Sequence, residues 1–240
     1  MSVPVEVSVI LPTYQERRSL ELLYPALARV LAGVSAQLVV VDDGSPDGTA
    51  EYARSLQSPI PTTVIQRGRK LGLSSAVIAG FERSVGATLV VMDADGSHPP
   101  EAVLTLARAV APGGAEFALG SRWVPGGSAP GLSRGRRLIS AGAALLARPL
   151  VSVKDPMSGF FAFRRSILAR GTLAPIGYKI GLEILVKCRP NPIVELPIVF
   201  RPRSAGASKL GSGEIGHYAR HVARLYAWRL FGSRRASSTR

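Results

Sequence analysis

The sequence has little cysteine, few aromatic side chains and no long apolar run. Cys188 is the only cysteine among 240 residues, which excludes an internal disulfide and a zinc site built from several cysteines. A single thiol is typical of a reducing compartment. A membrane-spanning helix needs roughly 20 apolar residues, and the closest run, Leu138–Leu150, is too short and contains Arg148. We therefore expect a cytoplasmic protein that at most attaches to a membrane surface.

Acidic side chains are scarce in the second half of the chain. Residues 1–100 carry 8 basic and 10 acidic side chains, residues 101–200 carry 13 and 5, and residues 201–240 carry 9 and 1. A near-neutral half followed by a basic half favours two surfaces with different partners, although a plain solvated basic face has the same composition. An isoelectric point near 11 also fits nucleic-acid binding. The basic stretches lack interleaved aromatic residues that stack on bases, so we expect no nucleic-acid partner.

The first 110 residues alternate strand and helix patterns four times. Apolar strands are expected to end at Pro12, Val41, Gln66 and Met92, and helices are expected over residues 16–31, 48–56, 73–85 and 99–110. This alternation predicts an α/β fold with a mostly parallel sheet covered by helices on both faces. The second half is less regular, with strands expected over 116–120, 159–164 and 193–200 and helices over 136–150, 181–188 and 214–231.

Polar side chains gather where three of these strands end. They are Thr13, Tyr14 and Glu16 after the first strand, Asp42 and Asp43 after the second, and Asp93 and Asp95 after the fourth. Parallel sheets bind ligands at the carboxyl ends of their strands, so these side chains are expected to line one pocket. Of the adjacent pair, we expect one aspartate to shape the loop and the other to face a nucleotide.

The segment Asp93-Ala94-Asp95 is the strongest candidate for a metal site. Two carboxylates at positions i and i+2 after a buried strand repel each other, and a divalent cation would relieve that repulsion. Oxygen ligands favour Mg²⁺ or Mn²⁺, held partly by substrate phosphates. The plain alternative is a pair of solvated loop aspartates. His98 is a neighbour that either touches the ligand or shapes the loop, and we expect no zinc site at His217 and His221.

Basic side chains in later loops are the candidates for phosphate binding. Arginine binds phosphate oxygens through two N–H groups and lysine binds as a point charge. Arg203 and Lys209 lie in a glycine-containing loop between residues 201 and 213, which favours closure over a ligand. For any one of these cations, surface solubility is the competing interpretation.

Several motifs occur together in a recognisable order. They are PTYQE (12–16), VVDDGSPDGT (40–49), RKLGLSSA (69–76), MDADGSHPPE (92–101), GSR (120–122), DPMSGFFAFRR (155–165), GYKIGLEIL (177–185) and AGASKLGSGEI (205–215). With them the chain resembles glycosyltransferase family 2 enzymes of the dolichyl-phosphate (polyprenol-phosphate) mannosyltransferase type, from about Val5 to about Tyr226. The early motifs are shared across family 2, and the later ones are typical of the lipid-phosphate branch.

The resemblance implies a GT-A fold with a single Rossmann-like nucleotide-diphospho-sugar transferase domain and an inverting mechanism. That domain would span residues 1–231, with a nucleotide-binding half (1–110), an acceptor-binding half (111–231) and a disordered basic tail (232–240). Many members carry glutamine at the position of Ser97, and others carry serine. The donor nucleotide sugar is expected at Pro12, Tyr14, Glu16, Val41, Asp43, Asp93, Ala94, Asp95, Arg203 and Lys209. The metal is expected at Asp93, Asp95 and Ser97, the acceptor phosphate at Arg122, Arg136 and Ser140, and direct catalysis at Asp95, Arg122, Arg203 and Lys209.

The same resemblance implies the partners and the cofactor. They are GDP-mannose as the donor, a polyprenyl or dolichyl phosphate as the acceptor, Mg²⁺ or Mn²⁺, and an anionic membrane surface on the cytoplasmic side. The sequence leaves open whether a membrane-anchoring subunit takes part. It also leaves open a UDP-glucose-dependent polyprenyl-phosphate glucosyltransferase, which would use the same acidic cluster, and an inactive scaffold that keeps the fold.

Overall fold

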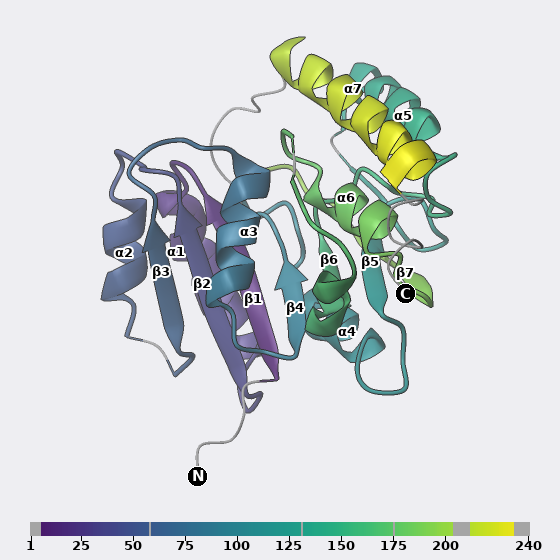
Figure 1. The fold of residues 1–240 in the computed structure, drawn as a ribbon. Helices are drawn as coiled ribbons and strands as arrows, with labels where there is room; N and C mark the ends of the chain where they lie inside the picture. Colours follow the sequence, from purple (N-terminus) through teal and green to yellow (C-terminus); the bar gives the residue numbers. More distant parts are fainter. Residues whose placement is uncertain (1–5, 58, 131, 175, 204–211, 233–240) are drawn as a thin grey trace.

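The computed structural model describes residues 6–57, 59–130, 132–174, 176–203 and 212–232 of the chain (Figure 1). The predicted phosphate-binding residue Lys209 and the tail from residue 233 onward lie outside the described residues. No helix in the described part is long and apolar enough to cross a membrane.

One seven-stranded sheet forms the centre of the molecule. Its strands are β1 (Val7–Thr13), β2 (Ala36–Asp42), β3 (Thr62–Gln66), β4 (Thr88–Val91), β5 (Phe117–Ser121), β6 (Phe161–Arg164) and β7 (Ile193–Pro197). They are arranged in the order β3-β2-β1-β4-β6-β5-β7. Only β6 runs antiparallel to its neighbours, β4 and β5. The prediction of a mostly parallel sheet is confirmed.

Helices occupy the connections between the strands. They are α1 (Arg17–Val30), α2 (Thr49–Ser55), α3 (Leu73–Arg83), α4 (Ala102–Ala109), α5 (Arg134–Ala147), α6 (Ile180–Lys187) and α7 (Ser212–Ala227), with a 3₁₀ turn, η1 (Arg165–Arg170), and a final π turn, η2 (Trp228–Gly232). The predicted elements are all present with shifted ends. The helix expected to begin at Pro99 begins at Ala102, because Pro99 and Pro100 form a preceding turn that accepts hydrogen bonds from Ala102 and Val103.

Both faces of the sheet are buried, as the continuous apolar strands predict. Along β1, Ile10 packs into the core on the α3 and α6 side, whereas Val9 and Leu11 pack into the core on the α1 and α4 side. The predicted leucine stripe of the first helix, Leu20, Leu23, Leu27 and Leu31, is almost fully buried in the second core. The result is a three-layer α/β/α arrangement.

The order of the strands reverses at β1. The chain moves from β1 outward to β2 and β3, and β4 then returns to the other side of β1. Open α/β sheets bind their ligands in the crevice outside the carboxyl ends of the strands at such a reversal point. Glu16 follows β1 and Asp93 follows β4, so the fold places both acidic side chains at this crevice.

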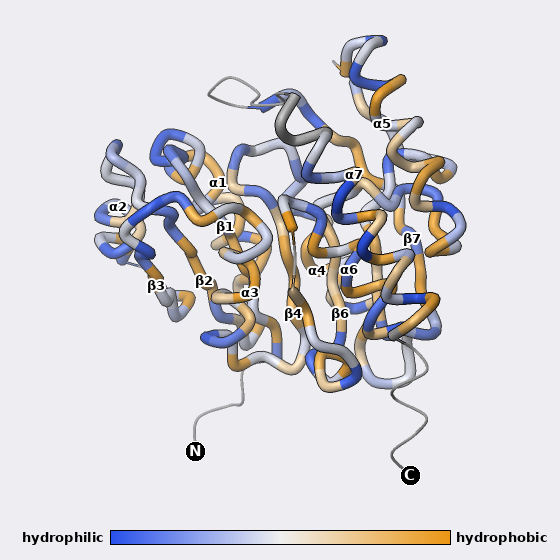
Figure 2. Tube along the Cα trace, turned by 45° about the horizontal axis from the view of Figure 1, so that its top comes forward, coloured by the Kyte–Doolittle hydropathy of each residue, from blue (hydrophilic) through white to orange (hydrophobic). Residues whose placement is uncertain are grey.

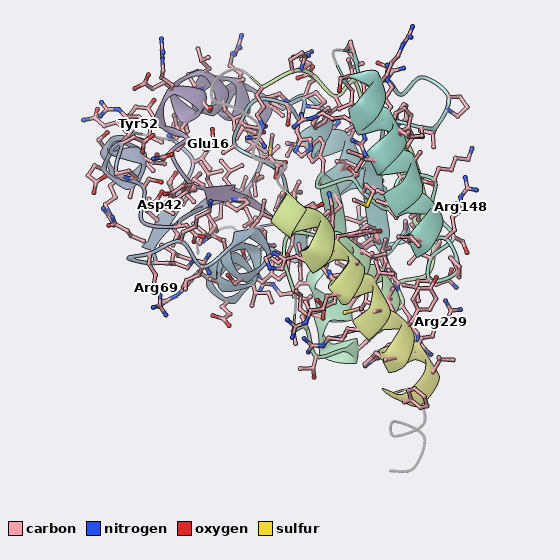
Figure 3. The ribbon with its side chains drawn as sticks, turned by 90° about the horizontal axis from the view of Figure 1, so that it is seen from above. Glu16, Asp42, Tyr52, Arg69, Arg148 and Arg229 are labelled. Atoms are coloured by element: carbon pink, nitrogen blue, oxygen red, sulfur yellow. The ribbon has the colours of Figure 1, made fainter. Side chains whose placement is uncertain are left out.

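Helices α5 and α7 form a pair beside the carboxyl edge of the sheet (Figure 1). The Tyr218 hydroxyl donates a 2.6 Å hydrogen bond to the Ala143 carbonyl, and the Tyr226 hydroxyl donates one of 2.9 Å to the Leu146 carbonyl. Seen from above, the pair lies across the molecule from Glu16 and Asp42, with Arg148 and Arg229 on its outer end (Figure 3).

A buried charged cluster fastens α7 to α6. The Lys187 ammonium donates a 2.5 Å hydrogen bond to Glu183, the Ala174 main-chain N–H donates one of 2.9 Å to the same carboxylate, and His221 Nε2 on α7 lies 3.4 Å from it. Burial raises the pKa of Glu183, but the interactions with His221 and Lys187 outweigh burial and bring it to about 2. The cluster therefore holds an ionised carboxylate inside the protein.

We predict that Glu183→Gln lowers the free energy of unfolding by about 3–5 kcal/mol, because it leaves the Lys187 ammonium buried without a counter-charge. Urea denaturation at pH 7 measures this loss. The folded-state pKa is depressed, so the stabilisation is present above the ordinary value of 4.5 and disappears as the pH falls toward 2.

The control is Glu21→Gln, which removes an exposed ion pair with Arg17 on α1. We expect it to cost less than about 1 kcal/mol. Equal stability of the wild type and Glu183→Gln at pH 7 would contradict the prediction.

Candidate active site

The acidic segment after β4 is held by a buried histidine. The main-chain N–H of Asp93 donates a 2.9 Å hydrogen bond to His98 Nδ1, and the His98 ring stacks on Phe160 with a 5.0 Å centroid separation. Burial lowers the pKa of His98, which favours the neutral ring that this acceptor role requires. Of the two roles left open by the sequence, the geometry supports shaping the loop.

Asp95 is fixed on both of its carboxylate oxygens. Oδ1 accepts hydrogen bonds from the main-chain N–H of Ser97 at 2.9 Å and from the Ser97 hydroxyl at 2.6 Å. Arg203 Nε lies 2.9 Å from Oδ2. Arg203 comes from the segment after β7, more than one hundred residues later in the chain. The structure therefore brings together two predicted site residues from distant parts of the sequence.

Three acidic side chains share the crevice. Glu16 interacts electrostatically with the carboxylates of Asp93 and Asp95 and with Arg203. Asp93 interacts in the same way with Asp95, Arg203 and Lys179. Burial raises the pKa of both Glu16 and Asp93, and the neighbouring Asp95 charge raises both further. Such an arrangement is costly when every carboxylate is ionised, so it favours a bound cation.

The oxygen donors here fit a hard divalent cation. The Asp93 and Asp95 carboxylates and the Ser97 hydroxyl are the ligand types that Mg²⁺ and Mn²⁺ prefer. Within the described ranges, no three His, Cys, Asp or Glu side chains form a complete protein cage for a metal. An ion at this position would share its ligands with substrate phosphates, which is common for Mg²⁺.

The predicted nucleotide side of the site lies at the ends of β1 and β2. Pro12 and Val41 are buried and stand opposite each other in the sheet register. Tyr14, half-buried just after β1, has the Lys70 ammonium 4.6 Å from its ring centroid. These residues lie together, as expected, and their contact with a nucleotide stays a prediction.

Asp42 and Asp43 are both bonded within the protein. Asp42 accepts hydrogen bonds from the main-chain N–H and the hydroxyl of Ser45. Asp43 pairs with Arg67, whose Nε lies 2.6 Å from Oδ1, and its Oδ2 accepts from the main-chain N–H groups of Leu71 and Gly72. Both aspartates therefore shape loops, and the contact of Asp43 with a nucleotide stays a prediction.

The Asp43–Arg67 pair organises the wall beside Tyr14. Arg67 also donates to the Ser75 hydroxyl and the Gly72 carbonyl. Gly44 has a φ of 73°, and a Cβ there would lie 2.9 Å from the main chain of Gly68 and Arg69, so only glycine permits this approach. The loop over residues 67–72 is therefore pinned to the end of β2.

Arg122, predicted to bind the acceptor phosphate, follows β5 and is paired with Asp155. Its Nε and Nη2 donate hydrogen bonds of 2.8 and 2.7 Å to the two oxygens of the buried Asp155 carboxylate. The charge of Arg122 also acts on His98. Arg122 therefore lies close to the acidic segment.

The other predicted acceptor residues lie on α5. Arg136 and Ser140 are half-buried and four residues apart, so they share one face of the helix. The Ser133 hydroxyl caps the start of this helix by accepting from the Arg136 main-chain N–H. Their approach to a phosphate stays a prediction, and Lys209 lies outside the described residues.

Sequence reasoning assigned no role to three residues that the structure places at the site. Lys179, at the start of α6, donates a 2.5 Å hydrogen bond to the Met157 carbonyl and acts on the charges of Asp93 and His98. Asp155 and Arg67 are the partners of Arg122 and Asp43. All three fall in or beside quoted motifs, but nothing in the linear spacing indicates which partner each one meets.

Comparisons with known proteins identify the family to which the chain belongs. Residues 8–172 match the family model described as Glycosyl transferase family 2. The chain belongs to glycosyl transferase family 2. A dolichol-phosphate mannosyltransferase of Pyrococcus furiosus is 45% identical over 93% of this chain, although the chain spans only 64% of that relative's length. A dolichol-phosphate mannosyltransferase of Saccharomyces cerevisiae is 38% identical over 95% of this chain and 90% of its own length.

Solved structures with the same architecture are more distant in sequence. Glucosyl-3-phosphoglycerate synthase from Mycobacterium tuberculosis, crystallised with Mn²⁺ and UDP-glucose, has a TM-score of 0.67 and 24% identity, over 93% of this chain and 78% of that chain. At this identity the likeness shows the fold alone. This family 2 member therefore has the expected GT-A fold.

We predict that Asp43→Asn loosens the loop over residues 67–72 even without a nucleotide. The change leaves Arg67 buried with a weakened partner and is expected to lower the free energy of unfolding by about 3 kcal/mol. Hydrogen exchange at the Leu71 and Gly72 amides should accelerate more than exchange elsewhere. Unchanged exchange at these two amides would show that Asp43 does not anchor the loop.

Proposed function

We propose that this family 2 glycosyltransferase moves mannose from GDP-mannose to a polyprenyl or dolichyl phosphate with inversion at the anomeric carbon. The observation that carries the proposal is the convergence of Glu16, Asp93 and Asp95 with Arg203 at the crevice between β1 and β4. Anionic and cationic groups that meet in one crevice suit a metal-bound nucleotide diphosphate. Relatives named as mannosyltransferases, at 38–45% identity over most of the chain, supply the expected sugar and acceptor.

A UDP-glucose-dependent glucosyltransferase is the less favoured alternative. The solved structures that hold UDP-glucose are 24% identical or less and support the fold only. A polyprenol monophosphomannose synthase of Mycolicibacterium smegmatis is 38% identical over 86% of this chain and 82% of its own length. The mannosyltransferase relatives therefore outweigh the glucosyltransferase structures in the choice of donor.

Asp93 and Asp95, with the Ser97 hydroxyl as a further oxygen, would hold Mg²⁺ or Mn²⁺. Such an ion, when bound, neutralises the negative charge that develops on the diphosphate as it leaves. Arg203 is held beside this position by its ion pair with Asp95. We propose that Arg203 and Lys209 together contact the diphosphate. Tyr14, Pro12 and Val41 would form the nucleotide wall.

A phosphate acceptor explains why no general base is needed. A lipid monophosphate is already anionic at neutral pH and attacks the anomeric carbon without losing a further proton. Rate enhancement would then rest on positioning and charge stabilisation. Arg122, Arg136 and Ser140 would orient the acceptor oxygen, and Arg203 would stabilise the leaving group.

The lipid acceptor implies that the protein meets a membrane surface, and α5 is the helix suited to it. Its exposed apolar side chains form one stripe, because positions 138 and 145, like 139 and 146, are two turns apart: Leu138, Ile139, Leu145 and Leu146. The tube of α5 alternates hydrophobic and hydrophilic segments (Figure 2). With Arg134 and Arg137 at its start, α5 suits shallow insertion among anionic lipids, and we propose the cytoplasmic face as the location.

We predict that the purified protein transfers mannose from GDP-mannose to a short polyprenyl phosphate when Mg²⁺ or Mn²⁺ is present, and that a chelator abolishes transfer. Asp95→Ala should lower kcat/KM by at least about a hundredfold, since it removes charge stabilisation of the leaving diphosphate. Radiolabelled sugar recovered in the lipid phase measures the product.

The matched control is Glu51→Ala, which removes an exposed carboxylate on α2 that forms a 3.8 Å ion pair with Arg54 outside the acidic segment. It should retain nearly full activity. Transfer from UDP-glucose in preference to GDP-mannose would overturn the donor assignment, and unchanged activity of a folded Asp95→Ala protein would overturn the metal role.

We also predict that the double change Leu138→Asp and Leu145→Asp weakens binding to vesicles containing phosphatidylserine. Each leucine is more than 60% exposed, so the fold should tolerate the change. Loss of two inserted side chains, together with added negative charge, should lower the partition coefficient by at least about tenfold. Vesicle sedimentation measures binding, and Leu22→Asp on α1, equally exposed, is the control. Equal binding of all three proteins would argue against α5.

A further inference from the structure

We infer that Asp155 is a positioning residue for acceptor binding, which sets the orientation of the Arg122 guanidinium and is itself set by Glu195. This inference rests on the proposed function, because it concerns the acceptor phosphate at Arg122. Asp155 lies in the segment between α5 and β6 and has no exposed surface. Among the described residues, the side chain that donates to its carboxylate is that of Arg122.

The contact between the two residues is side-on. Asp155 Oδ2 accepts from Arg122 Nε at 2.8 Å and from the Arg122 main-chain N–H at 3.0 Å, while Oδ1 accepts from Nη2 at 2.7 Å. One carboxylate thus fixes both the main chain and the head group of the same arginine. Three hydrogen bonds to a buried carboxylate leave the guanidinium plane little freedom to turn.

Side-on binding leaves the opposite edge of the guanidinium unused by Asp155. A guanidinium has five N–H donors, and this contact uses Nε–H and one N–H of Nη2. The pair formed by Nη1 and the second N–H of Nη2 points away from the carboxylate, and that pair matches two oxygens of one phosphate. The Trp123 and Phe200 rings lie 5.4 and 5.5 Å from the Arg122 Cζ and further restrict the plane.

Glu195 on β7 supports Asp155 from behind. Its carboxylate accepts hydrogen bonds from the main-chain N–H groups of Lys154 at 2.7 Å and Asp155 at 3.1 Å. Glu195 is paired with Leu119 in the register of β5 and β7, two residues before β5 ends at Ser121. Arg122 follows β5, so the sheet positions both Glu195 and Arg122, the two ends of the hydrogen-bonded series Glu195–Asp155–Arg122.

The sign of the effect separates positioning from simple electrostatics. The Asp155 carboxylate is an anion beside the site of an anionic substrate. If only charge mattered, neutralising it would remove a repulsion and tighten binding of the phosphate. If Asp155 acts by orienting Arg122, its removal should weaken acceptor binding instead. The two views therefore predict opposite changes in the KM for the lipid phosphate.

The test is steady-state kinetics of Asp155→Asn with GDP-mannose and farnesyl phosphate, each varied in turn. We expect the KM for farnesyl phosphate to rise at least about tenfold, because an oriented hydrogen bond to a charged group is worth about 1.5–3 kcal/mol. The KM for GDP-mannose should stay within about twofold. A lower or unchanged acceptor KM, or an equal rise for both substrates, would overturn the inference.

The matched control is Glu116→Gln. Glu116 also holds an arginine, Arg170, through two hydrogen bonds and accepts from a main-chain N–H, that of Asn191, but it lies outside the site. Both KM values should stay unchanged. In a double-mutant cycle, Asp155→Asn should add little to Arg122→Lys, because the carboxylate acts through Arg122; full additivity would contradict the inference.

Two further measurements keep the test decisive. If Asp155→Asn does not fold, Glu195→Gln keeps Asp155 and should raise the KM for the acceptor, but not for the donor, by about threefold. No rise would overturn the inference.

Calorimetric titration with farnesyl phosphate measures acceptor binding independently of turnover. If the wild type transfers no mannose, the proposed function fails, yet weaker farnesyl phosphate binding by Asp155→Asn would still support the role of Asp155, and unchanged binding would refute it.

Discussion

The repulsion among acidic side chains at the reversal point of the sheet is the constraint on which the rest of the site depends. Strand order places Glu16 after β1 and Asp93 after β4, and the loop that follows adds Asp95. Burial makes this charge costly and requires cations nearby. Arg203 and Lys179 come from distant segments to meet it, and the proposed metal and diphosphate complete the balance.

The second half of the chain supplies cations that offset this negative charge, and each of them is held in a fixed orientation by a partner. Arg203 is bound to Asp95, Lys179 to the Met157 carbonyl and Arg122 to Asp155. Arg203 and Arg122 are therefore each paired with a carboxylate and do not depend on solvent alone for their interactions. This explains how a chain with a net charge of +14 can direct part of its basic surplus to one pocket.

The fold could be predicted from the sequence because its signals are local. Apolar strands, the leucine stripe of α1 and the polar residues at strand ends appear within short windows, and the structure confirms them. The partners of the functional residues could not be predicted, since Asp43 and Arg67 are 24 residues apart and Arg122 and Asp155 are 33 apart. The strand order that joins them is a property of the whole sheet.

The same distinction applies to Asp42 and Asp43, because the sequence does not indicate which groups their carboxylates bind inside the protein. A doubled aspartate at a strand end indicates ligand contact and loop capping equally well, because an exposed carboxylate can serve either purpose. The choice depends on whether a buried cation and free main-chain N–H groups lie within reach. Here Arg67, Leu71 and Gly72 supply them to Asp43, and Ser45 supplies them to Asp42. Asp95 is likewise held by Ser97 and Arg203, so the acidic segment differs in the repulsion among Glu16, Asp93 and Asp95, which a metal ion would relieve.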